Sequence, residues 1–199
     1  MNKQILNLSK IIVLGLLLSF TTKDAEAPTW NIDSNHTSIS FEVTHFFTPV
    51  AGSFKDFDGS LNFDPENLAG SSADFTVKIN SVETDNEKRN GHLQSEDFFN
   101  AEKYPEMKFK SSSFTKSGEE YTIIGNLTIR DITKEISIPV EVLGIGEHPM
   151  KKSKLITAMR AEFLLNRNDY GVGSGSWTAT AVVGDEVKVS VLLEANRNK

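Results

Sequence analysis

The feature that most constrains the fold of this chain is an alternation of apolar and polar residues, which recurs from residue 28 to the C-terminus. Four segments show the alternation clearly: 38–44, 74–79, 135–142 and 187–194. Four more show it weakly: 57–63, 107–113, 121–129 and 155–165. A period of two puts alternate side chains on a buried face and a wet face, so each segment is typical of a β-strand.

The number and spacing of these strands indicate the architecture. Turn-forming residues separate the strands at 64–67, 117–118, 130–131 and 184–185. Many short strands with regular turns favour a barrel or a sandwich, and a closed barrel also removes exposed edges. We therefore predict an all-β fold, an extended eight-stranded antiparallel barrel, in one domain over residues 28–199. Strands of about ten residues would give a bore about 30 Å long, suited to packed side chains or one slim ligand.

One segment, residues 86–99, lacks the alternation and is rich in charge. Residues 85–88 have the pattern of a helix start, and the Tyr-Pro pair at 104–105 marks the end of the non-strand segment. We predict a short helical segment, interrupted near Gly91, that lies across one mouth of the barrel as a gate or as a rigid plug. Leu93, Phe98 and Phe99 would form its apolar underside. The other long connections are predicted at 144–154 and 166–176.

Residues 1–27 have the pattern of a secretory signal peptide. Lys3 and Lys10 give a basic start, residues 11–20 are almost wholly apolar, and Ala-Glu-Ala at 25–27 fits the small-residue pattern of a cleavage site. The apolar run is about ten residues, well short of the roughly 20 that a membrane-spanning helix needs. We predict cleavage after Ala27, export from the cytoplasm, and no stable membrane span.

Composition excludes several classes of function. The 21 basic and 27 acidic residues give a net charge of −6, and no run of Lys and Arg supplies a local footprint for nucleic acid. The absence of cysteine excludes disulfides, thiolate metal sites and a cysteine nucleophile. We therefore predict no nucleic-acid partner.

The histidines and the glycine-rich stretch do not form a recognisable reactive site. His36, His45, His92 and His148 contain no pair at the short same-face spacing of metal ligands. The motifs G-x-S-x-G and His-Glu-x-x-His are absent, and residues 171–175 lack the context of a phosphate loop. We predict no catalytic residue, metal or cofactor. His45 continues the apolar phase of its strand, so it would point inward, either as a hydrogen-bonded core histidine or as a contact for a ligand head group.

Nine short motifs, in order along the chain, resemble the YceI-like family. They are WNID at 30–33, HTSISFEVTH at 36–45, VAGSF at 50–54, FDGSL at 57–61, SVET at 81–84, RNGHLQSEDFF at 89–99, YPEMKF at 104–109, GNLTIRDITK at 125–134 and NRNDYGV at 166–172. The stretch at 89–99 is the most specific, and the match runs over nearly all of residues 28–199. Two residues depart from the family pattern: Asn90 stands where an acidic residue is common, and Tyr170 replaces Phe.

The resemblance implies a lipocalin-like form of the barrel and a periplasmic or secreted location. It also implies a long-chain amphiphile in the bore, namely a polyisoprenoid, an isoprenoid quinone or a fatty amide, and homodimers, which several family members form. The residues that match the inward phase of the strands are the predicted ligand contacts: Ile39, Phe41, Val43, His45, Phe75, Val77, Met107, Phe109, Leu127, Val140, Met159 and Phe163.

Three functions stay open at the level of sequence. The leading hypothesis is a non-catalytic carrier or store for a polyisoprenoid lipid. The second is an enzyme that acts on a lipid, with His45 or His92 as general base, although no partnered acid or nucleophile is evident. The third is an envelope stress or interaction protein with a solid core, because an apolar strand face does not distinguish a hollow barrel from a filled one.

Overall fold

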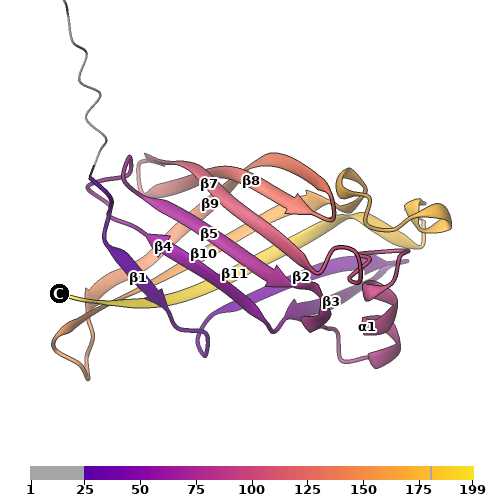
Figure 1. Ribbon diagram of the computed structural model, residues 1–199, viewed down its shortest axis with the longest axis horizontal. Helices are drawn as coiled ribbons and strands as arrows, with labels where there is room; N and C mark the ends of the chain where they lie inside the picture. Colours follow the sequence, from indigo (N-terminus) through magenta and orange to yellow (C-terminus); the bar gives the residue numbers. More distant parts are fainter. Residues whose placement is uncertain (1–24, 180) are drawn as a thin grey trace, which may run out of the picture.

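A computed structural model describes residues 25–179 and 181–199, which form a long β-barrel with one short α-helix at an end (Figure 1). The strands are β1 (Thr29–Ile32), β2 (Ser38–His45), β3 (Thr48–Phe54), β4 (Phe57–Asn62), β5 (Ser72–Lys78), β6 (Val82–Glu83), β7 (Glu106–Ser117), β8 (Glu120–Ile129), β9 (Ile132–Glu147), β10 (Lys154–Asn166) and β11 (Val183–Asn198). The helices are α1 (Glu87–Gln94) and the 3-10 helices η1 (Ile79–Ser81), η2 (Arg167–Tyr170) and η3 (Gly175–Thr178). Residues 1–24, most of the predicted signal peptide, lie outside the described residues.

The strands occupy eight positions around a closed antiparallel barrel. The pairing runs β1–β4–β5–β7–β8–β9–β10–β11, and β11 returns to β1. β2 also pairs with β11, and the chain β2–β3–β6 continues the positions of β1, β4 and β5 toward the end of the barrel that carries α1. The predicted eight-stranded antiparallel barrel is confirmed, and the pairing of β11 on both sides leaves its backbone groups satisfied along both edges.

The predicted strands all form, and the differences lie where the alternation is weak. β3 was not predicted because Pro49, Ala51 and Gly52 interrupt its apolar pattern. The predicted loop at 144–154 is shorter than expected, since β9 extends through Glu147. Gly144 and Gly146 suggest a turn in the sequence, yet their backbones pair in register with Ala158 and Ile156 of β10. Ladder hydrogen bonding there outweighs the low strand propensity of glycine.

Helix α1 is continuous, so the prediction of an interruption near Gly91 is wrong. The side chain of Asn86 caps the helix by accepting a hydrogen bond from the Arg89 N–H at 3.0 Å, and Ser95 ends it. Gly91 is exposed, and a methyl group at its Cβ position would meet no atom within 4 Å. Glycine lowers helix propensity without breaking the hydrogen-bond pattern, so capping and packing maintain the helix.

The end of the barrel opposite α1 is filled by side chains. Its buried aromatic residues are Trp30, Phe63, Phe114 and Tyr121. The Trp30 indole N–H donates to the Phe63 carbonyl at 2.9 Å, which satisfies the polar atom of the largest ring. Figure 1 shows β1, which carries Trp30, at the far end from α1. Among the described residues, no helix has the length and apolar character needed to cross a bilayer.

Candidate ligand-binding cavity

A cavity of about 260 Å³ lies inside the barrel, with an almost wholly apolar wall. Strands β2, β4, β5 and β7 to β11 contribute to the wall, together with Leu93, Phe98 and Phe99 near α1. Small-molecule pockets in proteins measure about 300–1,000 Å³. The volume is slightly below that range, and a narrow cavity spread along a barrel fits a slim chain better than a compact polar metabolite.

The structure places eleven of the twelve predicted contact residues in this wall. They are Ile39, Phe41, Val43, Phe75, Val77, Met107, Phe109, Leu127, Val140, Met159 and Phe163. The alternation of apolar and polar residues therefore predicted correctly that these eleven side chains face the bore. Contact with a ligand stays a prediction for all of them.

The prediction that His45 points into the bore is wrong. His45 is exposed, does not line the cavity, and packs its ring on Phe46 at a centroid distance of 4.5 Å. It is the last residue of β2, where the register with β11 shifts between Val183 and Val187. The extra residues of this irregularity lie on β11, so His45 keeps the phase of Val43 but lies past the last β2 residue that lines the cavity.

Three glycines in the wall make room for three of the lining rings. An ideal Cβ at each glycine would lie 2.4–2.6 Å from a phenylalanine ring carbon, closer than real contacts allow. The pairs are Gly52 with Phe41, Gly59 with Phe75, and Gly125 with Phe109. Each ring therefore rests on the backbone of a neighbouring strand. This packing lets large rings line the barrel and still leave space along its axis.

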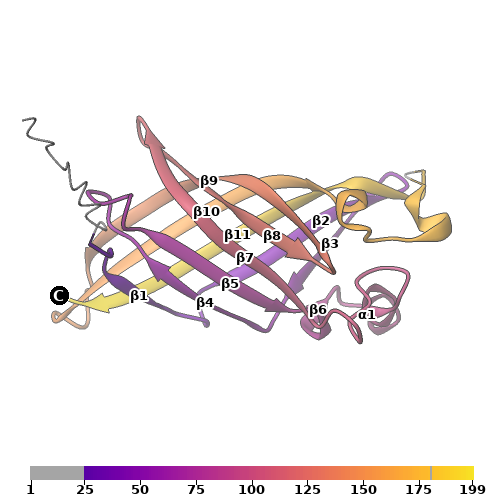
Figure 2. The same cartoon turned by 45° about the horizontal axis from the view of Figure 1, so that its top comes forward.

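Two segments cover the mouth of the barrel at the α1 end (Figure 2). One is α1 with the turns that follow it, and the other is the connection that carries η2 and η3. The Ser174 N–H donates to the Asp97 carbonyl at 2.7 Å, and the rings of Phe98 and Trp177 lie 5.7 Å apart. The Arg130 guanidinium donates to the carbonyls of Phe98 and Gly171, one from each segment. Together the two segments form a lid, and Leu93, Phe98 and Phe99 form its apolar underside as predicted.

The polar side chains at the wall fall into three groups. Lys108 and Arg160 are exposed, and their charged ends pair with Glu106 and Glu141 outside the barrel, at 3.0 Å and 3.2 Å. Ser40 donates to the Ser190 carbonyl. Arg167 and Tyr170, both on η2, are buried, at 6% and 2% exposure.

Comparison with known proteins gives the family. The family model described as YceI-like domain matches residues 30–195. The chain belongs to the YceI-like family. It is 31% identical over 193 residues to the protein YceI of Salmonella arizonae, with 94% of this chain and 98% of that one aligned. The barrel is similar to the crystal structure of Burkholderia cenocepacia BcnA, with a TM-score of 0.76, 28% identity, and coverage of 83% of this chain and 99% of that one.

A more distant structural neighbour supports the fold. The chain is similar to a domain from Saccharophagus degradans described as a polyisoprenoid binding domain implicated in plant cell wall breakdown. The TM-score is 0.61 at 16% identity, and the alignment covers 83% of this chain and 97% of that domain. The resemblance stated from the motifs is thus confirmed at the level of family and barrel.

Arg167 and Tyr170 are two polar wall residues of this YceI-like barrel that the strand pattern missed. Both lie on η2, outside any alternating segment, so the period of two carries no information about their orientation. The sequence signal for these residues was the glycine-rich stretch at 171–175, which directly follows Arg167 and Tyr170. Gly173 in this stretch has a φ of 94°, and an ideal Cβ there would lie 2.2 Å from Arg167 Nη1.

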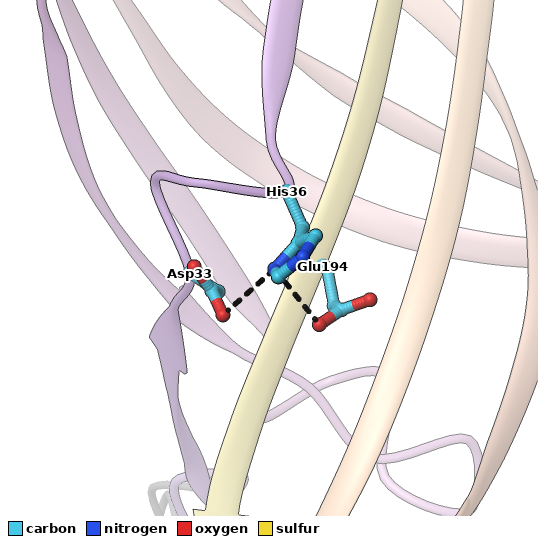
Figure 3. Close-up of side chains that lie close together, drawn as sticks. All are labelled: Asp33, His36 and Glu194. Atoms are coloured by element: carbon cyan, nitrogen blue, oxygen red, sulfur yellow. Dashed lines mark hydrogen bonds and ion pairs between the residues drawn. The ribbon is translucent and has the colours of Figure 1, made fainter.

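A separate polar cluster lies on the outer surface, where Asp33, His36 and Glu194 meet (Figure 3). His36 Nδ1 lies 3.1 Å from Asp33 Oδ2 and 3.6 Å from Glu194 Oε1. The hydrogen bond with Asp33 raises the pKa of His36 above its usual value and lowers that of Asp33. The cluster is solvent-exposed and lies on the outer face of the barrel, so we interpret it as an ion-pair contact that joins the β1–β2 turn to β11.

Proposed function

We propose that this YceI-like protein is a non-catalytic carrier or store that holds a polyisoprenoid or isoprenoid quinone chain in the barrel bore. The observation that carries the proposal is the apolar cavity, which the aromatic residues around Trp30 close at one end and the lid covers at the other. The description of the S. degradans domain as polyisoprenoid-binding supports the same ligand class. A fatty amide is the other chain amphiphile with a comparable shape.

The energetics favour a chain ligand in such a bore. Removing about 400 Å² of apolar surface from water would contribute about 10 kcal/mol of gross stabilisation, at about 25 cal/mol per Å². Ordering the chain and losing its translational freedom offset a large part of that gain. The remainder is compatible with a carrier, which must both retain its ligand and release it.

The positions of the histidines argue against the alternative of a lipid-modifying enzyme. The cavity wall includes neither His45 nor His92. His92 Nε2 lies 3.2 Å from Asp97 Oδ2, and its ring packs between Phe98 and Trp177 on the lid. A general base must reach the proton that it abstracts, and these side chains do not face the space where the chain would lie. We also propose a periplasmic or secreted location, on the basis of the signal-peptide pattern.

Extraction of the purified protein tests the proposal. Full-length protein would be exported in a bacterial host, purified without detergent, and extracted with organic solvent for mass spectrometry. We expect one prenyl lipid or prenyl quinone per barrel. A protein that turns over added prenyl lipid would support the enzyme instead, and a folded protein that neither carries nor takes up a chain lipid would contradict the carrier.

A further inference from the structure

The Tyr170 hydroxyl is a buried polar group without a partner, on a residue that lines the otherwise apolar cavity. Tyr170 is 2% exposed, and its hydroxyl is one of three buried side-chain atoms in residues 25–179 and 181–199 that have no hydrogen-bond partner. It also lines the cavity, which the other two residues in that group, Asp74 and Arg197, do not. Leaving such a group unpaired is unfavourable, and because the residue belongs to the wall, a ligand oxygen in the bore is a candidate acceptor.

A buried positive charge is carried by the same short helix, on Arg167. Arg167 and Tyr170 are three residues apart on η2, and side chains at that spacing lie on the same side of a 3-10 helix. Both line the cavity. This end of the bore therefore differs chemically from the rest of the wall, which is apolar.

The Arg167 guanidinium is held by neutral groups and forms no ion pair within residues 25–179 and 181–199, although Asp185 is near enough to act on it electrostatically. It donates to the carbonyls of Gly184 and Val183 at 2.8 Å, to the carbonyl of Val172 at 2.9 Å, and to Asn168 Oδ1 at 3.1 Å. These four hydrogen bonds fix the side chain and leave one of its five N–H groups unused. The charge is fixed but not neutralised, so it favours an electron-rich oxygen nearby.

Burial also keeps the hydroxyl in the form that donates. Burial raises the pKa of Tyr170 above its usual value, so the O–H stays protonated at neutral pH. Burial lowers the pKa of Arg167, but the ordinary pKa of a guanidinium is high enough that the charge remains. The pair therefore offers an O–H donor beside a cation, which suits a carbonyl, carboxylate or phosphate oxygen.

We infer that Tyr170 donates a hydrogen bond to an acceptor oxygen at the end of the ligand's apolar chain, beside the charge of Arg167. The lipid would then lie with its head group under the lid and its tail toward the aromatic residues around Trp30. This inference rests on the proposed function, because it assigns the orientation and head-group chemistry of the chain lipid that the barrel is proposed to hold.

The test compares two probes that differ only in the acceptor oxygen. They are the prenyl ketone geranylgeranylacetone and the corresponding hydrocarbon without the carbonyl. Binding of each to delipidated full-length protein would be measured for the native sequence, for Tyr170→Phe, and for the control Tyr121→Phe. Tyr121 is equally buried at 5% exposure, but it does not line the cavity.

We expect Tyr170→Phe to weaken binding of the ketone about 3- to 10-fold, as loss of one hydrogen bond predicts, and to leave binding of the hydrocarbon unchanged. Tyr121→Phe should change neither. The thermal midpoint of empty Tyr170→Phe should not fall, because an unpaired hydroxyl has been removed. Equal weakening of both probes, or no change in either, would overturn the inference while the carrier function stands. Failure of the native protein to bind either probe would overturn both.

Discussion

Val43 and Thr44 are neighbours on β2 whose side chains leave opposite faces of the barrel wall. Val43 lines the cavity, and Thr44 is exposed. We expect Val43→Trp to fill the bore and lower bound chain lipid severalfold, whereas Thr44→Trp should leave it unchanged. Overpacking typically costs about 1–3 kcal/mol of stability, so circular dichroism must first show that both variants are folded. Equal lipid content in the two folded variants would contradict the inward assignment of Val43.

His36 provides a pH-dependent contact at the residue scale. Its pKa is raised mainly by the hydrogen bond with Asp33, with smaller electrostatic contributions from Asp33 and Glu194. The contribution to stability is therefore complete below the unfolded-state pKa of about 6.5 and is lost as the pH rises through the higher folded-state value. NMR titration should give a raised pKa for His36 that falls more in Asp33→Asn than in Glu194→Gln. An unchanged titration in Asp33→Asn would show that the ion pair does not form in solution.

At the scale of the strands, the wall glycines set the space available along the axis. An ideal Cβ at Gly59 would lie 2.5 Å from Phe75 Cδ1 and 2.8 Å from the Asp74 carbonyl. Gly59→Ala should push the ring toward the bore, reduce lipid capacity, and destabilise the barrel by about 1–3 kcal/mol. Gly91→Ala is the matched control, because its position on α1 is open, and it should stabilise the helix by about 1 kcal/mol. Urea unfolding and lipid binding would measure both, and similar effects at the two positions would contradict the packing described for Gly59.

The lid is the element in which opening is expected. Helix α1 has eight residues, too few for stability without tertiary contacts, and Asn90 is its one buried residue. We expect amide hydrogen exchange to be fast in residues 86–99 of empty protein and slower once a chain lipid is bound, with β10 and β11 protected in both states. Protection of 86–99 equal to that of the strands in both states would identify the lid as a rigid plug.

The sequence predicted the strands and the wall, but not the ends of the barrel, for a physical reason. Alternation reports which side chains face inward wherever a strand is regular, as at Phe75, Leu127 and Phe163. His45 is the last residue of β2 and lies past the enclosed part of the bore, and alternation gives the face of a residue but not where the enclosed bore ends. Tyr170 lies on a 3-10 turn whose orientation depends on tertiary contacts of Arg167 and Gly173, which local periodicity does not encode.

At the scale of the whole molecule, the two ends of the closed barrel differ, and this difference indicates the end at which a ligand would enter. One end is filled by aromatic side chains of the strands and their turns, and the other is covered by two lid segments that pack together through Phe98, Tyr170 and Val172. A ligand therefore has one evident route in, at the α1 end. The same contrast places the polar pair Arg167 and Tyr170 next to that route, whereas the deep end of the cavity is apolar.

The occupancy of the bore can be measured directly by intermolecular nuclear Overhauser effects. Methyl-labelled protein loaded with unlabelled geranylgeranylacetone would be compared at adjacent residues that face opposite ways. Leu165 and Val191 line the cavity, whereas Leu164 and Leu192 are 58% and 41% exposed. We predict contacts from the prenyl chain to the methyl groups of Leu165 and Val191 and none to those of Leu164 and Leu192. Contacts confined to the outer pair, or a bound chain that reaches neither cavity residue, would contradict a lipid held inside the barrel.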